Sequence, residues 1–338
     1  MKPTRCLLFG VGEVGLAAAR MLLKGGIEIV GCYTRTKHLG ADLGSVAGVD
    51  HAGITIQANA AFAARRGLAD VALFCTTTSL DDLQGEARQC LETGINVVTI
   101  AEDALYPWTY YADQAAELDR IARAGGATLT STGINDAVMA YLPLVTAAYM
   151  PNVSRIEASC VGNFGRLGVA SLSAMPLGLA ADEARAAFAD AIAPGKIPPT
   201  YSTPVLRAML AAGGFRAGDF KITLEPVLAT REIYLEQLDR RIPVGHVSGF
   251  EESSSVTTED GVTFFIHLIG KVFEDGDEEY QQVRVQGDSP TITLKVGPMA
   301  SIEATAAIAV NRVPDVVAAP PGFLTLDKLG VPRFTRWR

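Results

Sequence analysis

The segment Arg5-Cys-Leu-Leu-Phe-Gly10-Val-Gly-Glu-Val-Gly15 decides the fold, because an apolar strand runs directly into a glycine-rich turn that opens a helical stretch. In such a turn Gly10 permits the tight bend, Gly12 lets a pyrophosphate approach the backbone, and Gly15 allows the helix to pack closely on the strand. Free N–H groups at the positive end of the helix then receive the phosphates. The predicted dinucleotide contacts in this turn are Gly10, Val11, Gly12, Glu13, Val14 and Gly15.

Short apolar runs alternate with helical stretches through the first 135 residues. The predicted strands are Arg5–Phe9, Ile27–Tyr33, Ile54–Ile56, Val71–Cys75, Ile95–Ile100 and Ala127–Ser131. The predicted helices are Val14–Lys24, Ala60–Arg66, Leu80–Glu92 and Thr109–Ala124. Strands that are apolar throughout, separated by amphipathic helices, indicate a parallel sheet covered on both faces. We therefore predict an α/β fold, a doubly wound Rossmann domain over residues 1–136.

The pattern changes after Asn135. The predicted helices are Ala137–Tyr149, Ala181–Ile192, Pro204–Ala212 and Ala300–Arg312. The predicted extended runs are Val153–Val161, Lys221–Ile233, Pro243–Ser254, Val262–Phe273 and Tyr280–Val296. Tight turns such as Glu259-Asp-Gly261 join the later runs and indicate an antiparallel or mixed sheet. We predict an α+β domain over residues 137–299, followed by a helix and tail over 300–338.

Composition limits the possible partners. The chain has 338 residues, a formal net charge of −8, 49% hydrophobic and 20% charged residues. Such a chain is globular, and an acidic surface without a Lys/Arg block predicts binding neither to nucleic acid nor to a membrane. The N-terminus runs straight into a strand without a signal-peptide core, so we expect a cytoplasmic protein.

Cysteine and histidine are too dispersed for a metal centre. The five cysteines are Cys6, Cys32, Cys75, Cys90 and Cys160. They contain no C-x-x-C pair, and the four histidines do not cluster either. Metal sites need grouped ligands, whereas single thiols in apolar strands behave as small hydrophobes. We predict no metal site and free cysteines in the core.

Two loops after the strands carry further candidate cofactor contacts. The second strand ends in Thr34-Arg-Thr-Lys37, with hydroxyls and cations where an NAD-preferring site would place an acidic residue. Thr34, Arg35 and Thr36 therefore suit the 2′-phosphate of NADPH, with some use of NADH expected; the alternative is a solvated loop. The fourth strand ends in Cys75, Thr76, Thr77 and Thr78. These residues could line the ribose and pyrophosphate groove, or the hydroxyls there could cap the helix at Leu80.

A single carboxylate follows the fifth strand. Glu102 comes after Ala101 at the carboxyl edge of the sheet, where ligands of doubly wound folds bind, and apolar and aromatic residues flank it. A carboxylate in such surroundings can have its pKa raised, as a general base near neutral pH requires. The alternative is that Glu102 or Asp103 merely leads into the next helix. We place Ala101 beside the cofactor.

Four motifs along nearly the whole chain carry a family resemblance. They are Gly10-x-Gly12-x-x-Gly15, Asn96–Glu102 continued by Tyr106-Pro-Trp108, Thr132-Gly-Ile-Asn135, and Ala309–Pro314 with Pro321-Gly-Phe323. Together they resemble the native NAD(P)H-dependent amine dehydrogenases and the 2,4-diaminopentanoate dehydrogenases, within the dihydrodipicolinate-reductase-like group. The resemblance implies a Rossmann domain, a central substrate domain that also dimerises, and a C-terminal helix that returns to the cofactor.

The resemblance also implies an activity: reductive amination of a small ketone or aldehyde with ammonia, and the reverse oxidative deamination. It makes Glu102 the catalytic residue and places Asn135 and Asn311 near the nicotinamide carboxamide. The substrate pocket would include Ile134, Met139, Arg166 and Leu167. Where the family usually has Pro-Gly-Phe after this asparagine, the chain has Asp136-Ala-Val138, which leaves the pocket wall open.

Other functions stay open on the same scaffold. One is a 2,4-diaminopentanoate dehydrogenase-like or dihydrodipicolinate-reductase-like reductase of a carboxylated imine, in which Arg166 would pair with the carboxylate. Another is a non-enzymatic NADP-binding sensor. We also predict a homodimer formed through the strands of residues 221–296, because their apolar content exceeds what two helices can cover.

Overall fold

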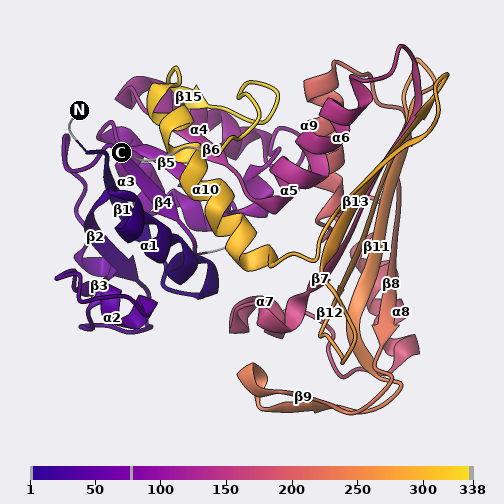
Figure 1. Ribbon diagram of the computed structural model, residues 1–338, viewed down its shortest axis with the longest axis horizontal. Helices are drawn as coiled ribbons and strands as arrows, with labels where there is room; N and C mark the ends of the chain where they lie inside the picture. The colour runs from indigo at the N-terminus through magenta and orange to yellow at the C-terminus, as the bar shows by residue number, and fades with distance from the viewer. Residues whose placement is uncertain (1–2, 77–78, 335–338) are drawn as a thin grey trace. The chain divides into compact units, whose positions relative to one another are not determined.

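The computed structural model describes residues 3–76 and 79–334. It divides into two compact units. Unit 1 comprises Met1–Ala137 and Ile302–Arg338, and unit 2 comprises Val138–Ser301. The final segment of the chain therefore folds with the N-terminal one, and Figure 1 shows the yellow C-terminal helix beside the indigo and purple strands of the first sheet.

A parallel sheet of seven strands forms the centre of unit 1, in the order β15-β6-β5-β4-β1-β2-β3. The strands are β1 (Arg5–Phe9), β2 (Glu28–Thr34), β3 (Ile56–Ala58), β4 (Val71–Phe74), β5 (Asn96–Thr99), β6 (Thr128–Ser131) and β15 (Gly322–Phe323). The order 3-2-1-4-5-6 is that of a dinucleotide-binding Rossmann sheet, so the predicted fold class is confirmed. The strand β15 comes from the C-terminal segment and pairs in parallel with β6.

Helices cover both faces of this sheet. One face packs against α1 (Glu13–Gly25), α2 (Leu43–Ala47) and α10 (Ser301–Ala318), and the other against α3 (Glu86–Glu92) and α4 (Ala112–Gly125). Alternate residues of β1 serve the two cores: Leu8 lies in the first and Leu7 in the second, both fully buried. Each such side chain contributes about 1.5–3 kcal/mol through burial.

The predicted helix at Ala60–Arg66 is wrong. The structure has only a 3₁₀ turn, η1 (Asn59–Ala61), in this region. Phe62 is buried and packs edge-on against Phe9, with ring centroids 5.0 Å apart. One apolar anchor cannot supply the amphipathic face that a short helix needs.

Gly85 breaks the second mispredicted helix. The expected helix Leu80–Glu92 is divided into a 3₁₀ turn, η2 (Asp81–Gln84), and α3, because Gly85 adopts φ −87° and ψ −103° between them. The helix α2 was not predicted, although Asp42 gives it an N-cap by accepting a hydrogen bond from the Ser45 amide at 2.9 Å. The Asp42 side chain also accepts from the Ile54 amide, and this draws Ile54 out of the predicted strand.

The C-terminal helix α10 continues six residues past its predicted end at Arg312, to Ala318. Pro314 lies inside it, which costs about 3 kcal/mol through the missing N–H and the ring's clash with the preceding turn. Val313 and Val316 are both fully buried against the sheet of unit 1. Their burial, roughly 1.5–3 kcal/mol each, offsets the cost of the proline.

Unit 2 contains a mixed sheet of six strands in the order β14-β13-β7-β12-β11-β8, in which only β7 and β12 pair in parallel. The strands are β7 (Val153–Asn163), β8 (Lys221–Leu228), β11 (Val247–Thr257), β12 (Thr263–Lys271), β13 (Tyr280–Gly287) and β14 (Ile292–Val296). The two long runs predicted at Lys221–Ile233 and Tyr280–Val296 are each interrupted. A loop separates β8 from the small ribbon of β9 (Ile233–Leu235) and β10 (Arg240–Ile242), and a turn separates β13 from β14.

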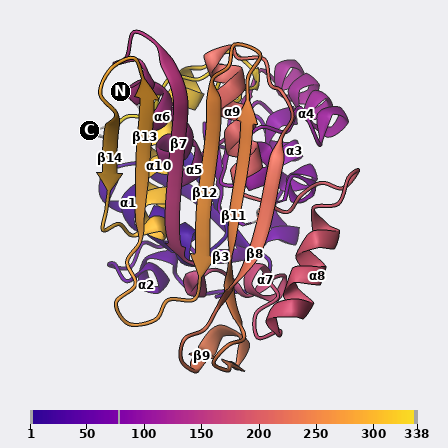
Figure 2. The ribbon, with the colours of Figure 1, turned by 90° about the vertical axis from the view of Figure 1, so that its right-hand side faces the viewer.

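Helices of unit 2 lie against one face of its sheet, here called the inner face. The α-helices are α6 (Leu142–Ala147), α7 (Val169–Ser173), α8 (Ala181–Ala191) and α9 (Ser202–Gly213). The short turns of unit 2 are η5 (Phe164–Arg166) and η6 (Glu236–Leu238), and the π-helix η4 (Ala137–Tyr141) begins at the boundary between the units. The short turns η3 (Glu102–Ala104) and α5 (Ile134–Asp136) belong to unit 1. α9 contacts β11 and β12, and α6 contacts β7 and β13. Figure 2 looks onto the opposite, outer face, where the strands lie in front of these helices.

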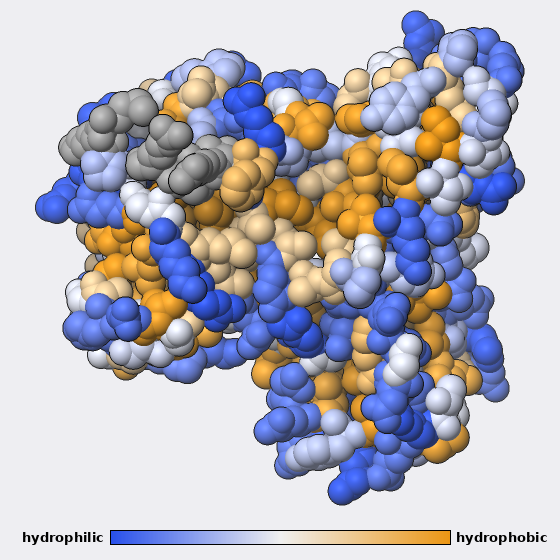
Figure 3. All heavy atoms as spheres, in the orientation of Figure 1, coloured by the Kyte–Doolittle hydropathy of each residue, from blue (hydrophilic) through white to orange (hydrophobic). Residues whose placement is uncertain are grey.

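Surface properties agree with the composition. Polar residues cover much of the face that Figure 3 draws of each unit, and exposed large apolar side chains are scattered from Leu39 to Phe334. Among the described residues, no helix has the length and apolar character needed to cross a membrane.

The same described residues contain no group of three potential metal ligands. All five cysteines are free and buried, and burial raises the pKa of the Cys6 thiol to about 12.

Candidate active site

The glycine-rich turn lies where the strand order reverses, between β1 and β4. Gly10 adopts φ +96°, and a Cβ there would lie 2.5 Å from the Cys75 carbonyl oxygen. A Cβ on Gly15 would lie 2.1 Å from the Gly10 carbonyl oxygen, so the first turn of α1 packs directly on the loop. At Gly12, by contrast, a Cβ would meet nothing within 4 Å. The turn is therefore closed on its protein side and open at Gly12, which fits an approaching pyrophosphate.

The loop after β2 reaches toward the loop after β4. Thr34 is buried, whereas Arg35 and Thr36 are exposed. The Arg35 guanidinium lies 3.3 Å from the Asp82 carboxylate and 3.5 Å from the Thr76 carbonyl oxygen. The predicted contacts Thr77 and Thr78 lie outside the described residues. The loops therefore bring Arg35 and Thr76 together, and they add an acidic neighbour, Asp82.

Glu102 and Asn135 meet at the other end of the same edge, after β5 and β6. The Asn135 Nδ2 donates to Glu102 Oε2 at 2.5 Å. Glu102 is half-buried and opens the 3₁₀ turn η3, while Asn135 lies in α5. An amide donor on one carboxylate oxygen favours the ionised form and fixes the direction in which the group points.

Buried polar groups hold the backbone on both sides of Glu102. The Thr99 Oγ1 accepts from the Ala101 amide at 3.1 Å, and the Ser131 Oγ donates to the Ala101 carbonyl at 2.7 Å. On the other side, the Asp103 carboxylate accepts from the Leu80 amide at 3.2 Å. Burial raises the pKa of Asp103, and the hydrogen bond from the Leu80 amide opposes this shift. The residues on both sides of Glu102 in the chain, Ala101 and Asp103, are thus held in place by hydrogen bonds.

The C-terminal segment supports the end of this loop. The Trp108 Nε1 donates to Thr325 Oγ1 at 3.1 Å, and its ring lies 5.6 Å from the Phe323 ring. The Thr130 hydroxyl donates to the Leu324 carbonyl at 2.6 Å. These contacts join the C-terminal segment to β6 and to the loop after β5 within unit 1.

Asp136 is turned inward. Its side chain is 3% exposed and lies 3.5 Å from the Arg312 guanidinium, which is 2% exposed. It also accepts from the Gly133 amide at 2.8 Å and from the Thr132 hydroxyl at 2.9 Å. Burial raises the pKa of Asp136, and Arg312 opposes this shift. The residue whose role in the pocket wall was left open is therefore part of a buried ion pair.

The residues predicted for the substrate pocket are divided between the units. Ile134 begins α5 in unit 1, whereas Met139 is buried in η4 of unit 2. Arg166 ends the 3₁₀ turn η5, and Leu167 packs against the apolar cluster of α7 and the β9–β10 ribbon. The predicted cofactor contact Asn311 occupies a half-buried position in α10.

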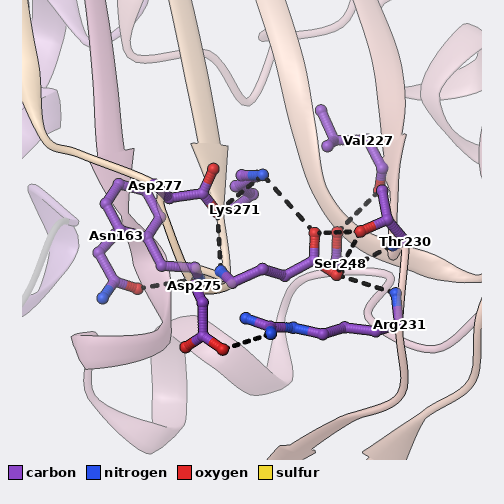
Figure 4. A network of polar contacts seen from close by, with 10 residues as sticks. Asn163, Val227, Thr230, Arg231, Ser248, Lys271, Asp275 and Asp277 are labelled. Carbon is purple, nitrogen blue, oxygen red and sulfur yellow. Dashed lines mark hydrogen bonds and ion pairs between the residues drawn. The ribbon is translucent and has the colours of Figure 1, made fainter.

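A polar network at the end of β12 in unit 2 includes Asn163, Lys271 and Asp277 (Figure 4). Through Asn163 it reaches the turn η5, which carries Arg166. The Asn163 Oδ1 accepts from the Gly165 amide at 3.0 Å and from the Phe273 amide at 3.4 Å. The Lys271 ammonium lies 2.9 Å from the Asp277 carboxylate, and the Glu274 carboxylate accepts from the Thr230 amide at 3.0 Å. These contacts tie η5 and the loop before β9 to the end of β12.

The sequence did not predict the contacts that Asp82, Asp136, Arg312 and Thr325 make at this edge. Asp82 had a signal, since it follows directly on the hydroxyl-rich loop. Arg312 had no such signal, because arginine side chains are mostly exposed to solvent and an arginine in a helix is not expected to be buried.

The fold and these loops define a Rossmann-type dehydrogenase. Comparison with known proteins agrees. The chain belongs to the 2,4-diaminopentanoate dehydrogenase family, whose C-terminal domain model matches residues 137–336. It is 26% identical to the 2,4-diaminopentanoate dehydrogenase of Acetoanaerobium sticklandii over 98% of this chain and 95% of that protein.

Solved structures give the same picture. An amine dehydrogenase from Mycobacterium smegmatis is 29% identical, with a TM-score of 0.89 over 99% of this chain and 98% of that one. A myo-inositol 2-dehydrogenase from Lactobacillus plantarum is 13% identical, with a TM-score of 0.58 over 97% and 93% of the two chains, and shows the fold alone. The predicted family is therefore confirmed.

Proposed function

We propose that this protein is a nicotinamide-dependent amine dehydrogenase in which Glu102 is the catalytic acid/base. The observation that carries the proposal is the Glu102–Asn135 contact at the carboxyl edge of the Rossmann sheet, in a chain of the 2,4-diaminopentanoate dehydrogenase family. The protein is an oxidoreductase acting on CH–NH₂ donors, and its substrates are a small carbonyl compound with ammonia in one direction and the corresponding amine in the other.

The cofactor is a nicotinamide dinucleotide, NAD or NADP. The glycine turn would hold its pyrophosphate, since Gly12 is open where Gly10 and Gly15 are closely packed. Arg35 would favour NADPH through a bidentate contact with the 2′-phosphate, with NADH also accepted. Asp82 now pairs with Arg35, so a 2′-phosphate has to displace a carboxylate, and this moderates the preference. We assign Asn135 and Asn311 to the nicotinamide end.

Charge explains why a carboxylate is needed. Ammonia attacks the carbonyl carbon, water leaves, and a cationic iminium forms. Glu102 accepts the proton that ammonium loses when it becomes a nucleophile, and it returns this proton to the hydroxyl group that leaves as water. The carboxylate is then ionised again and stabilises the iminium cation. Asn135 keeps the carboxylate directed, because one of its oxygens is already bonded. When bound, the cofactor supplies the hydride that reduces the iminium.

The family supports a second candidate substrate class. The matching family model and the Acetoanaerobium relative both carry the name 2,4-diaminopentanoate dehydrogenase. A diamino acid brings a carboxylate that a cation has to meet, and Arg166 on the fixed turn η5 is our candidate for it. The dihydrodipicolinate-reductase-like reading belongs to this same class of carboxylated imines.

One assay separates these substrates. Oxidation of a small alkyl amine and of 2,4-diaminopentanoate is followed at alkaline pH with NADP⁺ and with NAD⁺. We expect turnover of the alkyl amine; turnover of the diamino acid alone, lost in Arg166→Met, would transfer the assignment to the second class. No turnover of either, with dinucleotide binding intact, would contradict an enzymatic function and favour a sensor.

We also propose a homodimer formed through the outer face of the unit 2 sheet. Phe265 and Ile269 of β12 are only half-buried on that face, and the Arg155 guanidinium lies 5.4 Å from the Phe265 ring centroid. A sheet face of this kind is buried when a second copy packs on it. Sedimentation should show a dimer at micromolar concentration, and Phe265→Glu should shift it toward monomer. A cytoplasmic location remains a prediction, to be tested by cell fractionation.

A further inference from the structure

We infer that Asp136 and Arg312 are positioning residues for Glu102: they hold the turn that presents Asn135 to the Glu102 carboxylate. The inference rests on the proposed function, because it assumes that Glu102 carries the chemistry. It assigns a role to a residue, Asp136, that departs from the family's usual sequence and that the proposed mechanism does not itself use.

The Asp136 carboxylate gathers the turn around itself. It accepts from the Gly133 amide at 2.8 Å and from the Thr132 hydroxyl at 2.9 and 3.1 Å. Its charge is met by the Arg312 guanidinium, 3.5 Å away. All of these groups are buried, so water cannot replace a lost contact. The backbone from Thr132 to Asp136 is thus fixed from inside.

Arg312 anchors this turn to the C-terminal segment. Its Nη1 donates to the Gly330 carbonyl at 2.6 Å and lies 3.3 Å from the Asp315 carboxylate. Thr305, seven residues earlier and therefore on the same side of α10, forms a second contact with the turn. A Cβ on Gly133 would lie 3.2 Å from the Thr305 Cγ2. The helix α10 therefore touches the turn at two points.

Asn135 is the next residue along the chain from Asp136, and its Nδ2 reaches Glu102. A small displacement of the turn moves this donor, since nothing flexible separates it from the ion pair. Loss of the donor has two consequences: Glu102 takes up a proton at higher pH, and it points less accurately at the iminium. A purely structural ion pair would change stability without either effect.

Other charged and titratable groups approach this end of the sheet and have to be kept constant. They are Asp103 on η3, Asp81 on η2, Tyr111 before α4, Asp315 on α10 and Lys328 on the tail. Asp315 provides the matched control, because it pairs with Nη1 of the same guanidinium, whereas Asp136 pairs with Nη2. Asp315→Asn removes one of the two carboxylates that pair with Arg312 and leaves the contacts of Asp136 in place.

The experiment compares wild type with Asp136→Asn, Arg312→Met, the double variant Asp136→Asn/Arg312→Met and Asp315→Asn. The double variant guards against misfolding, because it leaves neither Asp136 nor Arg312 as an unpaired buried charge. Three quantities are measured: the pH profile of kcat/KM for amine oxidation, the NADPH dissociation constant, and the titration midpoint of the Glu102 carboxyl carbon by ¹³C NMR. The NMR signal is assigned through Glu102→Gln and needs no turnover.

We expect the double variant to fold and to lose kcat/KM roughly 10- to 100-fold, with NADPH affinity little changed. Its acid limb and its Glu102 midpoint should move to higher pH by about half to one unit. Asp315→Asn should lower the melting temperature but leave the midpoint in place. A midpoint unchanged in both Asp136 variants, or moved equally by Asp315→Asn, would overturn the inference. A shifted midpoint in a protein without amine turnover would leave the inference standing and contradict the proposed function.

Discussion

The carboxyl edge of the unit 1 sheet has two halves that are built in opposite ways. The glycine half, after β1, β2 and β4, is defined by missing side chains and by exposed charges, as at Gly12 and Arg35. The glutamate half, after β5 and β6, is defined by side chains held on both sides, as at Glu102. The pyrophosphate of a dinucleotide needs open space and free backbone N–H groups, whereas acid/base catalysis needs a single titratable side chain held in a fixed orientation.

The largest effect is expected in the glutamate half. Glu102→Gln keeps the size and the contact with Asn135 but removes the negative charge that the iminium needs. We expect turnover to fall roughly 10²–10⁴-fold in both directions. Asp103→Asn should cost far less, because Asp103 faces Leu80 and not the reacting centre. Steady-state rates of both variants with an alkyl amine check this, and more than about a tenth of wild-type turnover in the Gln variant would remove Glu102 from its role.

Glu252 of unit 2 is a buried carboxylate outside this edge, and it can be compared with Asp136. The Asp136 carboxylate pairs with the Arg312 guanidinium. The Glu252 carboxylate is fully buried and accepts a hydrogen bond from the Ser202 amide at 2.6 Å. Burial raises the pKa of Glu252 from its ordinary 4.5 to about 7. The folded protein then holds a proton that the unfolded chain has released, so stability falls as pH rises from about 4.5 to about 7, by on the order of 3 kcal/mol.

Denaturant unfolding at several pH values tests this assignment. Glu252→Gln stays neutral, so its stability should no longer fall across the interval from about 4.5 to about 7. Glu259→Gln, in an exposed turn between β11 and β12, is the control and should keep the wild-type slope. An unchanged slope in the Glu252 variant would mean that other groups control the pH dependence.

The glycine half can be divided by two substitutions that add the same methyl group. Gly15→Ala places a Cβ 2.1 Å from a backbone oxygen, so the apoprotein should lose about 1–3 kcal/mol of stability. Gly12→Ala meets no atom within 4 Å, so it should leave the apoprotein stable and weaken only the dinucleotide. Thermal unfolding with and without NADPH distinguishes these outcomes. Equal destabilisation of the two apoproteins would contradict the assignment of open space to Gly12.

The smallest effects concern the choice between NADPH and NADH. Arg35→Ala should weaken NADPH by about 1–3 kcal/mol and leave NADH nearly unchanged. Asp82→Asn frees Arg35 from an exposed pair worth about 1 kcal/mol or less, so NADPH should bind slightly more tightly. Fluorescence titration with both cofactors measures the four constants. Equal losses for both cofactors in the Arg35 variant would mean that the loop does not read the 2′-phosphate.

The two halves also differ in how far the sequence predicted them. The glycine turn is visible because local geometry imposes it: a strand, a bend and a helix occur within eleven residues. Six strands of the first sheet were predicted from their apolar character, whereas β15 (Gly322–Phe323), which comes from the C-terminal segment, was not. Glu102 was predicted to be catalytic from its place after β5 together with the family resemblance, and this role stays a prediction.

What the sequence did not reveal depends on contacts between distant segments. Asp136 and Arg312 are 176 positions apart, and nothing in either neighbourhood announces a buried ion pair. Trp108 and Thr325 are 217 positions apart and meet only because the C-terminal strand β15 joins the sheet. The helix α10 is longer than predicted for a related reason. Burial of Val313 and Val316 against the sheet outweighs the free-energy cost of Pro314 inside the helix.

We propose that the glycine half of this edge binds the dinucleotide and that the glutamate half carries the acid/base chemistry. Measuring the NADPH dissociation constant and the rate of hydride transfer at saturating cofactor, in Gly12→Ala and Glu102→Gln side by side, tests it most directly. We expect weaker binding with a near-normal rate for the glycine variant, and near-normal binding with a rate roughly 10²–10⁴-fold lower for the glutamine variant. A Glu102 variant that loses affinity and keeps its rate, or a Gly12 variant as slow at saturation as the Glu102 variant, would contradict it.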